Sequence, residues 1–110
     1  MYMNRQEKVD ETCRSTLIDW LVQIHFNFNL MPETLYLTVN AFDRFCSMVQ
    51  ITKKEVQLVG IAGLLSVAKY EEIYPPTLKD LVKISGDAYT AEQVINMERK
   101  ILYNLDFDVS

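Results

Sequence analysis

The stretch VQLVGIAGLLSVAKYEEIYPP, residues 56–76, decides the fold of this chain. Up to Ala68, its only polar residues are Gln57 and Ser66. A helix that is apolar all round is buried, so this segment predicts a central helix surrounded by other helices. The two prolines at its end stop the helix, because proline clashes with a continuing helix and biases the preceding residue away from helical geometry.

Patterns on either side of this segment predict four further helices. Thr52 with Glu55, and Thr90 with Gln93, have the spacing of capping boxes, which begin helices. Together with the apolar periodicity, the start signals place the outer helices at about residues 12–28, from Pro32 to about Ser47, from Thr77 to Ile84 and from Thr90 to Leu105. We therefore expect an all-α fold, a five-helix bundle with the third helix central and buried.

The first of these helices has an unusually wide apolar surface. Over residues 12–28, apolar side chains cover roughly two thirds of the circumference. One stripe facing a core requires less than that. Either this helix is central, or part of it meets a partner.

Composition argues against several classes of function. Apolar residues make up 49% and charged residues 24%, as in ordinary globular proteins. The net charge of −4 argues against sequence-neutral nucleic-acid binding and, weakly, against an anionic membrane surface. The longest apolar stretch is too short to span a bilayer, which needs about 20 residues, and the polar first ten residues do not form a signal peptide.

Nothing in the sequence indicates a cofactor, a metal or a catalytic centre. Cys13 and Cys46 lack the spacing of a zinc site or of a disulfide framework. His25, the only histidine, has no nucleophile motif beside it, so we interpret it as a solvated or hydrogen-bonded histidine. Lys53 and Lys54 are interpreted as a solvated helix start, and the dispersed tyrosines form no platform for stacking bases.

Two charges occupy positions where helical periodicity predicts aliphatic side chains. Lys69 falls on the track of Leu58, Ala62 and Leu65 in the third helix. Glu98 lies in the middle of the apolar stripe of the fifth helix, which contains Val94, Met97, Ile101, Leu102 and Leu105. Charged groups are seldom buried without partners.

Two interpretations of these charges stay open at this point. Each side chain can lie near a helix end and extend to water, which suits Lys69 but explains Glu98 poorly. Alternatively, Lys69 and Glu98 approach each other on an otherwise apolar surface. Such a surface is typical of an interface, where the two charges fix the orientation and the choice of partner.

The chain resembles the first cyclin box of the cyclin family along its whole length. The segments that carry the resemblance are RSTLIDWLVQIHFNF, ETLYLTVNAFDRF, VQLVG, AKYEEIYPP and YTAEQVINMERKIL, in that order and spacing. Two of them, LIDWLVQI and KYEEIYPP, are most similar to mitotic B-type cyclins. The family fold is a five-helix bundle with the third helix at its centre, in agreement with the periodicity.

The resemblance implies a regulatory subunit without an active site, which binds and activates a cyclin-dependent protein kinase in cell-cycle control. Cyclins hold the movable C-helix of the kinase inward, so that its Lys–Glu pair forms and its activation loop opens. By the match of motifs, the expected kinase-binding residues here are Lys69, Tyr70, Glu71, Glu98, Phe107 and Val109.

The resemblance also implies a groove on the first helix that receives Arg-x-Leu motifs of substrate or inhibitor proteins. The expected groove residues are Arg14, Leu17, Trp20, Gln23 and Gln57. Cys13 and Thr16 depart from the family motif, and Gln23 stands where some cyclins carry a glutamate. The departures shrink or polarise the groove, at about 0.8 kcal/mol for each lost buried methylene, so we expect weak or altered docking. Leu17 and Trp20 are also of a type that serves a core.

Two functions from different classes remain after this comparison. A kinase-activating cyclin box needs both Lys69 and Glu98, whereas an adaptor of cyclin fold that binds no kinase has no need for both charges. We expect residues 1–110 to be a single N-terminal cyclin box, without the upstream helix and second box that family members usually have. The resemblance further implies a location in nucleus and cytoplasm.

Overall fold

The structure, a computed structural model, describes residues 11–105 and contains five α-helices and one short turn of 3-10 helix in that range. Phe107 and Val109 lie outside the described residues. The elements in chain order are α1 (Glu11–Asn27), α2 (Pro32–Met48), η2 (Lys53–Glu55), α3 (Val56–Glu71), α4 (Leu78–Ile84) and α5 (Ala91–Leu105). The predicted all-α, five-helix architecture is confirmed.

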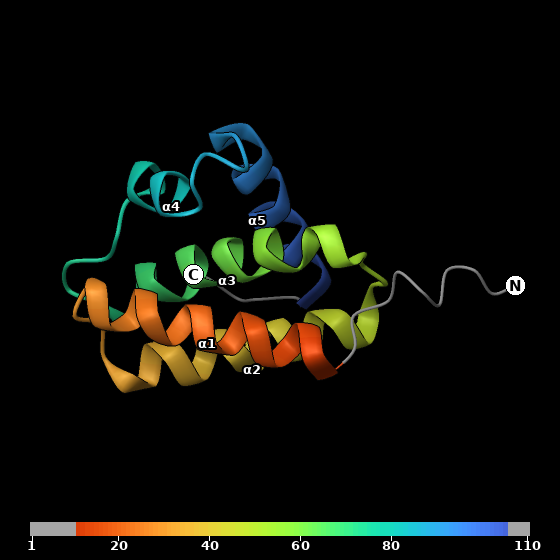
Figure 1. The fold of residues 1–110 in the computed structure, drawn as a ribbon, viewed down its shortest axis with the longest axis horizontal. Helices are drawn as coiled ribbons and strands as arrows, with labels where there is room; N and C mark the ends of the chain where they lie inside the picture. Colours follow the sequence, from red (N-terminus) through yellow and green to blue (C-terminus); the bar gives the residue numbers. More distant parts are fainter. Residues whose placement is uncertain (1–10, 106–110) are drawn as a thin grey trace, which may run out of the picture.

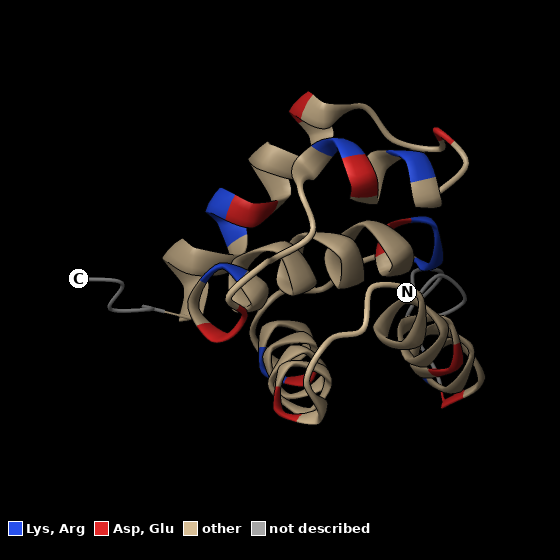
Figure 2. Cartoon of the chain, turned by 90° about the vertical axis from the view of Figure 1, so that its left-hand side faces the viewer, with Lys and Arg blue, Asp and Glu red and all other residues tan. Residues whose placement is uncertain are grey.

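The helices are arranged around α3. In Figure 1, α1 and α2 lie side by side along the long axis, α3 runs over them, α5 crosses α3, and α4 covers the top. The most extensive helix–helix contacts are those of α3 with α2 and with α5. Figure 2 shows the charged residues on the outer helices and at the ends of α3. The predicted central position of the third helix is therefore confirmed.

Burial of α3 follows directly from its composition. Every residue from Leu58 to Ala68 is buried, on all sides of the helix. An apolar surface of this kind is stable only when other helices cover it, at about 25 cal/mol per Å² removed from water. The largest of the fully buried side chains, Phe45, comes from α2.

Local hydrogen bonds fix where the helices begin. Thr77 and Asp80 cap α4 reciprocally, as the backbone N–H of each donates to the side chain of the other. The predicted box at the start of α5 is formed in the same way. The box of Thr52 and Glu55 starts the 3-10 turn η2, and α3 itself begins one residue later. That tighter turn is a common start of an α-helix.

The wide apolar surface of α1 is only partly covered. Leu17, Leu21 and Ile24 are buried, whereas Trp20 is half-buried and the side chain of Phe26 is 71% exposed. The interpretation of the first helix as central is wrong, because α3 occupies the centre. The other interpretation, that part of this helix meets a partner, stays a prediction.

Candidate functional site

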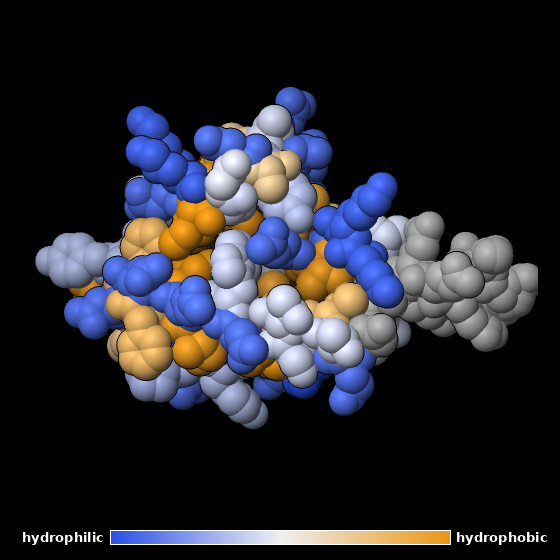
Figure 3. Space-filling view, viewed as in Figure 1, coloured by the Kyte–Doolittle hydropathy of each residue, from blue (hydrophilic) through white to orange (hydrophobic). Residues whose placement is uncertain are grey.

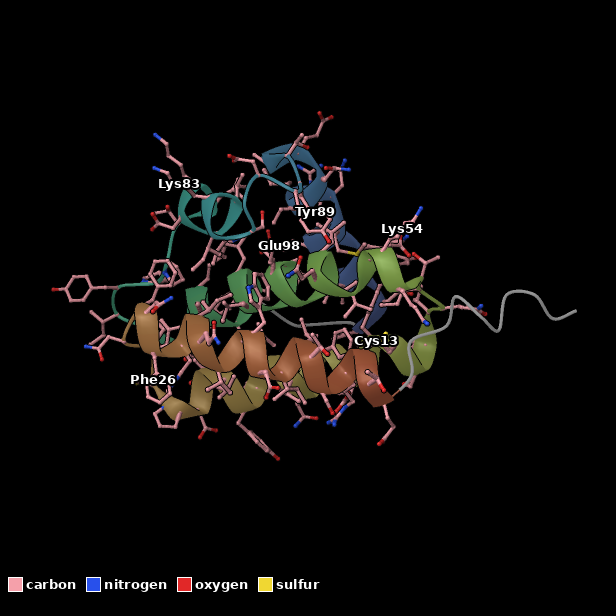
Figure 4. All side chains as sticks on the ribbon, viewed as in Figure 1. Cys13, Phe26, Lys54, Lys83, Tyr89 and Glu98 are labelled. Carbon is pink, nitrogen blue, oxygen red and sulfur yellow. The ribbon has the colours of Figure 1, made fainter. Side chains whose placement is uncertain are left out.

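Lys69 and Glu98 form an ion pair between the end of α3 and the middle of α5. The Nζ of Lys69 lies 2.7 Å from Oε2 of Glu98. The hydroxyl of Ser66, one turn earlier on α3, donates to the same oxygen at 3.0 Å. Figure 4 shows the Glu98 side chain, whose carboxylate therefore faces two donors from α3. The predicted approach of the two charges is confirmed.

The two partners differ in their exposure to water. The side chain of Glu98 is 9% exposed and that of Lys69 is 48% exposed. A buried carboxylate is stable only with donors around it, and here an ammonium and a hydroxyl supply them. Lys69 pairs with Glu98 and also reaches water, so each of the two sequence interpretations describes part of its position.

A cavity of about 460 Å³ opens beside this ion pair. Its other lining residues are mostly apolar and come from α3, the loop after it, α4 and α5: Leu65, Pro75, Pro76, Thr77, Leu78, Ile95 and Arg99. None of these seven was predicted as a site residue. On α5, Ile95 lies one turn before Glu98 and Arg99 directly follows it. The spacing from Glu98 along the helix could therefore have identified Ile95.

The rest of the KYEE segment divides into two roles. Tyr70 is exposed and Glu71 is half-buried, so both are accessible at the end of the bundle. Glu72 instead accepts hydrogen bonds from the backbone N–H of Met31, at 2.7 Å, and from the hydroxyl of Thr34. Its carboxylate thus caps the start of α2, which has no side-chain cap from Met31 itself. The sequence did not single out Glu72, because its partners are 38 and 41 residues away.

A second cavity, of about 490 Å³, joins α1 to the start of α3. Three of the expected groove residues line it, namely Leu17, Trp20 and Gln57. The two departures from the family motif, Cys13 and Thr16, line it too. The remaining lining residues are Thr12, Lys53, Lys54, Val56 and Tyr89. We call this cavity the α1–α3 groove.

The other two expected groove residues lie elsewhere. Arg14 makes a bidentate ion pair with Asp43 of α2, with both N···O distances at 2.8 Å, and lines a different cavity. Gln23 is exposed and is not among the residues of the α1–α3 groove. On a helix, residues 14 and 17 are only about 60° apart, so the ion pair with Asp43, and not a turn to the opposite face, holds Arg14 toward α2.

The cavity beside Arg14 and Asp43 contains a weakly acidic thiol. Its volume is about 790 Å³, and Cys46 of α2 lines it. Burial, and secondarily the charge of Asp43, raise the pKa of Cys46 to about 11. The hydrogen bond from Arg14 to Asp43 raises the pKa of the Arg14 guanidinium. A thiol with so high a pKa is a poor nucleophile at neutral pH.

His25 differs from its interpretation as a solvated or hydrogen-bonded histidine. Both ring nitrogens are buried, and neither has a hydrogen-bond partner among the described residues. The ring meets Phe26 edge to face, with centroids 5.3 Å apart. Packing on α1 therefore decides its position. Within residues 11–105, no cluster of potential metal ligands occurs, and no helix is long and apolar enough to cross a membrane.

Comparison with known proteins agrees with this architecture. The family model described as "Cyclin, N-terminal domain" matches residues 1–110. Cyclin-B1-3 of Arabidopsis thaliana is 51% identical over 107 residues, which are 97% of this chain and 26% of that protein. G2/mitotic-specific cyclin-2 of Antirrhinum majus is 48% identical over 106 residues, which are 96% of this chain and 24% of that protein.

A solved structure shows the same fold. The crystal structure of a viral cyclin from herpesvirus saimiri superimposes with a TM-score of 0.85 at 31% identity. The match covers 94% of this chain and 45% of the viral protein. The chain spans about a quarter of the length of the two plant relatives. On these matches and on its helical architecture, the chain belongs to the cyclin family, as an N-terminal cyclin domain similar to those of B-type cyclins.

Proposed function

We propose that this chain acts as a regulatory subunit, without an active site, that binds and activates a cyclin-dependent protein kinase. Two of its relatives are named G2/mitotic-specific cyclins, which supports a role in mitotic cell-cycle control. Action on such a kinase agrees with a location in nucleus and cytoplasm. The kinase-facing surface consists of Lys69, Glu98, Tyr70 and Glu71.

The observation that carries this proposal is the Lys69–Glu98 pair beside an apolar cavity. Lys69 is half-exposed and lies next to the exposed Tyr70. A pair that only stabilised the fold would not require such access to a partner. At an interface, such a pair becomes desolvated, and its charges then fix the orientation of the partner. α3 ends at Glu71, before the segment that carries the two prolines of the cavity lining, so Lys69 and Tyr70 lie in its last turn.

Capture and activation of a purified cyclin-dependent kinase test the proposal. We expect the wild-type chain to bind the kinase and to raise phosphorylation of a protein substrate. Lys69→Ala is expected to weaken capture at least about 30-fold, as is typical when one partner of a buried interfacial charge pair is truncated. Lys83→Ala is the matched control, because Lys83 is exposed on α4 and is not among the residues that line the cavity (Figure 4).

A double variant separates the kinase role from an adaptor role. Lys69→Ala with Glu98→Ala removes both charges and so leaves no unpaired carboxylate in the bundle. If the wild type captures no kinase, or if the double variant captures it equally well, the assigned interface is wrong. A chain that binds the kinase without activating it is instead an adaptor.

We further propose that Arg-x-Leu segments of substrates or inhibitors dock only weakly on the α1–α3 groove. The position of Arg14 and Gln23 away from the groove supports this, as does the polar Thr16 in its lining. Isothermal titration with an Arg-x-Leu peptide tests it. Micromolar binding that is lost in Trp20→Ala contradicts weak docking.

A further inference from the structure

Ser66 is a polar residue in the core of the bundle. Among the buried residues of α3 from Leu58 to Ala68, it alone has a polar side chain, and it is 2% exposed. In Figure 3, by contrast, hydrophilic groups cover much of the visible face of the molecule, where water can bind them. Because Ser66 is shielded from water, its hydroxyl needs a hydrogen-bond partner within the protein.

The partner of this hydroxyl lies on another helix. Ser66 donates to Oε2 of Glu98 on α5 at 3.0 Å. A hydroxyl within a helix can instead donate to the backbone oxygen one turn earlier, as Thr38 does to Thr34 at 2.7 Å on α2. Within residues 11–105, Ser66 makes no such bond and donates only to the carboxylate. Its role therefore depends on Glu98.

Lys69 and Ser66 donate to the same oxygen but differ in what else they can reach. The ammonium group of Lys69 lies 2.7 Å from Oε2 of Glu98, carries three N–H donors and belongs to a side chain that is 48% exposed. It can therefore donate to an acceptor outside the bundle. The short side chain of Ser66 stays in the core and has no access to such an acceptor.

Glu98 needs a donor that stays in place when a partner covers this surface. Its side chain is only 9% exposed, and contact with a partner removes the remaining water. A buried carboxylate that loses its donors is strongly destabilised, whereas a hydrogen bond to the charged group offsets part of this cost. Arg99 lines the same cavity, but within the described residues it forms no ion pair with Glu98. Ser66 is thus the donor that remains when Lys69 turns toward the partner.

We propose that Ser66 is a positioning residue of the kinase-facing surface, whose hydroxyl holds the Glu98 carboxylate while Lys69 donates to an acceptor on the kinase. Ser66 itself lies below the surface and does not touch the partner. It acts through Glu98, because the bond from α3 to α5 fixes the carboxylate beside the cavity. This inference rests on the proposed function and names a further residue on which binding of the kinase depends.

Capture of a purified cyclin-dependent kinase by Ser66→Ala tests the proposal. We expect this variant to bind the kinase about tenfold more weakly than the wild type, the loss typical of a hydrogen bond to a charged group. Ser66→Thr keeps the hydroxyl and is expected to retain most of the affinity. Val67→Ala is the matched control, because Val67 is a buried neighbour on α3 whose side chain has no polar atom to hold Glu98. It is expected to lower the stability of the chain and to bind the kinase as the wild type does.

Surface plasmon resonance gives the dissociation constant of each variant, and circular dichroism checks that each is folded. Three results overturn the proposal: an unchanged affinity in Ser66→Ala, an equal loss in Val67→Ala, or a folded Ser66→Thr that binds no better than Ser66→Ala.

A double-mutant cycle without the kinase tests the same bond independently. In the wild-type chain, Lys69 still holds Glu98 after the change Ser66→Ala. In the Lys69→Ala chain, Ser66 is the last donor, so Ser66→Ala is expected to lower the midpoint of urea unfolding by a larger amount there. A chain that folds with either single change but not with both supports the proposal in the same way. Equal shifts in the two backgrounds contradict it.

Failure of this inference is distinguishable from failure of the proposed function. If the wild type captures no kinase, the proposed function is wrong and the inference falls with it. If the wild type captures the kinase and Ser66→Ala captures it equally well, only the role of Ser66 is wrong. The assignment of Lys69 and Glu98 to the kinase-facing surface then stands.

Discussion

Gly60 of α3 lies against Leu17 of α1 so closely that a methyl group at position 60 would stand 2.7 Å from Cδ1 of Leu17. Leu17 is buried, so it has little room to move. The close approach of α1 to α3, and with it the floor of the α1–α3 groove, thus depends on the absence of a side chain at residue 60. Gly63 has open space where its Cβ would be.

Alanine at these two glycines is expected to have opposite effects. Gly60→Ala destabilises the chain by about 1 kcal/mol, because overpacking at about 1–3 kcal/mol exceeds the gain in helix propensity. Gly63→Ala stabilises it by about 0.5–1 kcal/mol, since the propensity gain meets no clash. Urea unfolding of both variants checks this. Equal shifts of the two midpoints would contradict the role assigned to Gly60.

The Lys69–Glu98 pair is expected to show strong coupling in a double-mutant cycle. Lys69→Ala leaves the buried carboxylate with Ser66 as its remaining donor, and we expect a cost of about 1 kcal/mol, at the low end because Lys69 is half-exposed. Adding Glu98→Ala removes the unpaired charge, so the double variant is expected to lose less than the sum of the two single variants. Additive free energies of unfolding would show that the pair does not stabilise the bundle.

Glu71 and Glu72, at the end of α3, are expected to affect different properties: Glu72 the stability of the fold, and Glu71 the capture of the kinase. Glu72→Ala removes the acceptor for Met31 and Thr34, and we expect it to lower the free energy of unfolding by about 1–2 kcal/mol, as for other helix caps. Glu71→Ala is the matched control, because its carboxylate takes no part in this cap. We expect Glu71→Ala to leave stability unchanged and to weaken kinase capture. Thermal unfolding and kinase capture measure the two effects. If Glu71→Ala lowered stability while Glu72→Ala left it unchanged and weakened kinase capture, the assignment of the two glutamates would be wrong.

The Arg14–Asp43 pair is expected to contribute little to the stability of the fold and nothing to peptide binding at the α1–α3 groove. Both side chains are about two-fifths exposed, and water and salt screen exposed ion pairs, so they stabilise a fold only weakly. Arg14→Ala is therefore expected to change the midpoint of urea unfolding only slightly and to leave peptide binding to the α1–α3 groove unchanged. Isothermal titration of the same Arg-x-Leu peptide into Arg14→Ala and into Trp20→Ala compares the two affinities. A loss of peptide binding in Arg14→Ala would show that Arg14 takes part in binding at the groove.

Cys46 is expected to resist alkylation at neutral pH. Its pKa of about 11 leaves almost no thiolate at pH 7.5, so modification by iodoacetamide accelerates about tenfold per pH unit up to that value. The folded-state pKa lies above the usual 9.0, so the contribution to stability is present below about pH 9 and is lost as the pH rises through about 11. Asp43→Asn is expected to lower the pKa only slightly, because burial is the main cause. Site-resolved mass spectrometry measures the rates, and rapid labelling of Cys46 at pH 7.5 in the folded chain would contradict this environment.

The sequence by itself determined the helices and the centre of the bundle. The capping pairs Thr77–Asp80 and Thr90–Gln93 act over three residues, and the apolar run of α3 leaves burial as its only stable environment. Periodicity also identified Lys69 and Glu98 as charges on apolar faces. Both kinds of information are local, because hydrogen bonds and helical faces repeat every three or four residues.

Only the tertiary structure decided which side chains meet. It brought Ser66 to Glu98, Glu72 to Thr34 and Arg14 to Asp43, across 32, 38 and 29 residues of sequence. It also placed Lys53 and Lys54, interpreted from sequence as a solvated helix start, at the edge of the α1–α3 groove. Such contacts depend on the angles and registers at which helices pack. Those are set by the joint fit of many core side chains, and no local pattern in the sequence contains them.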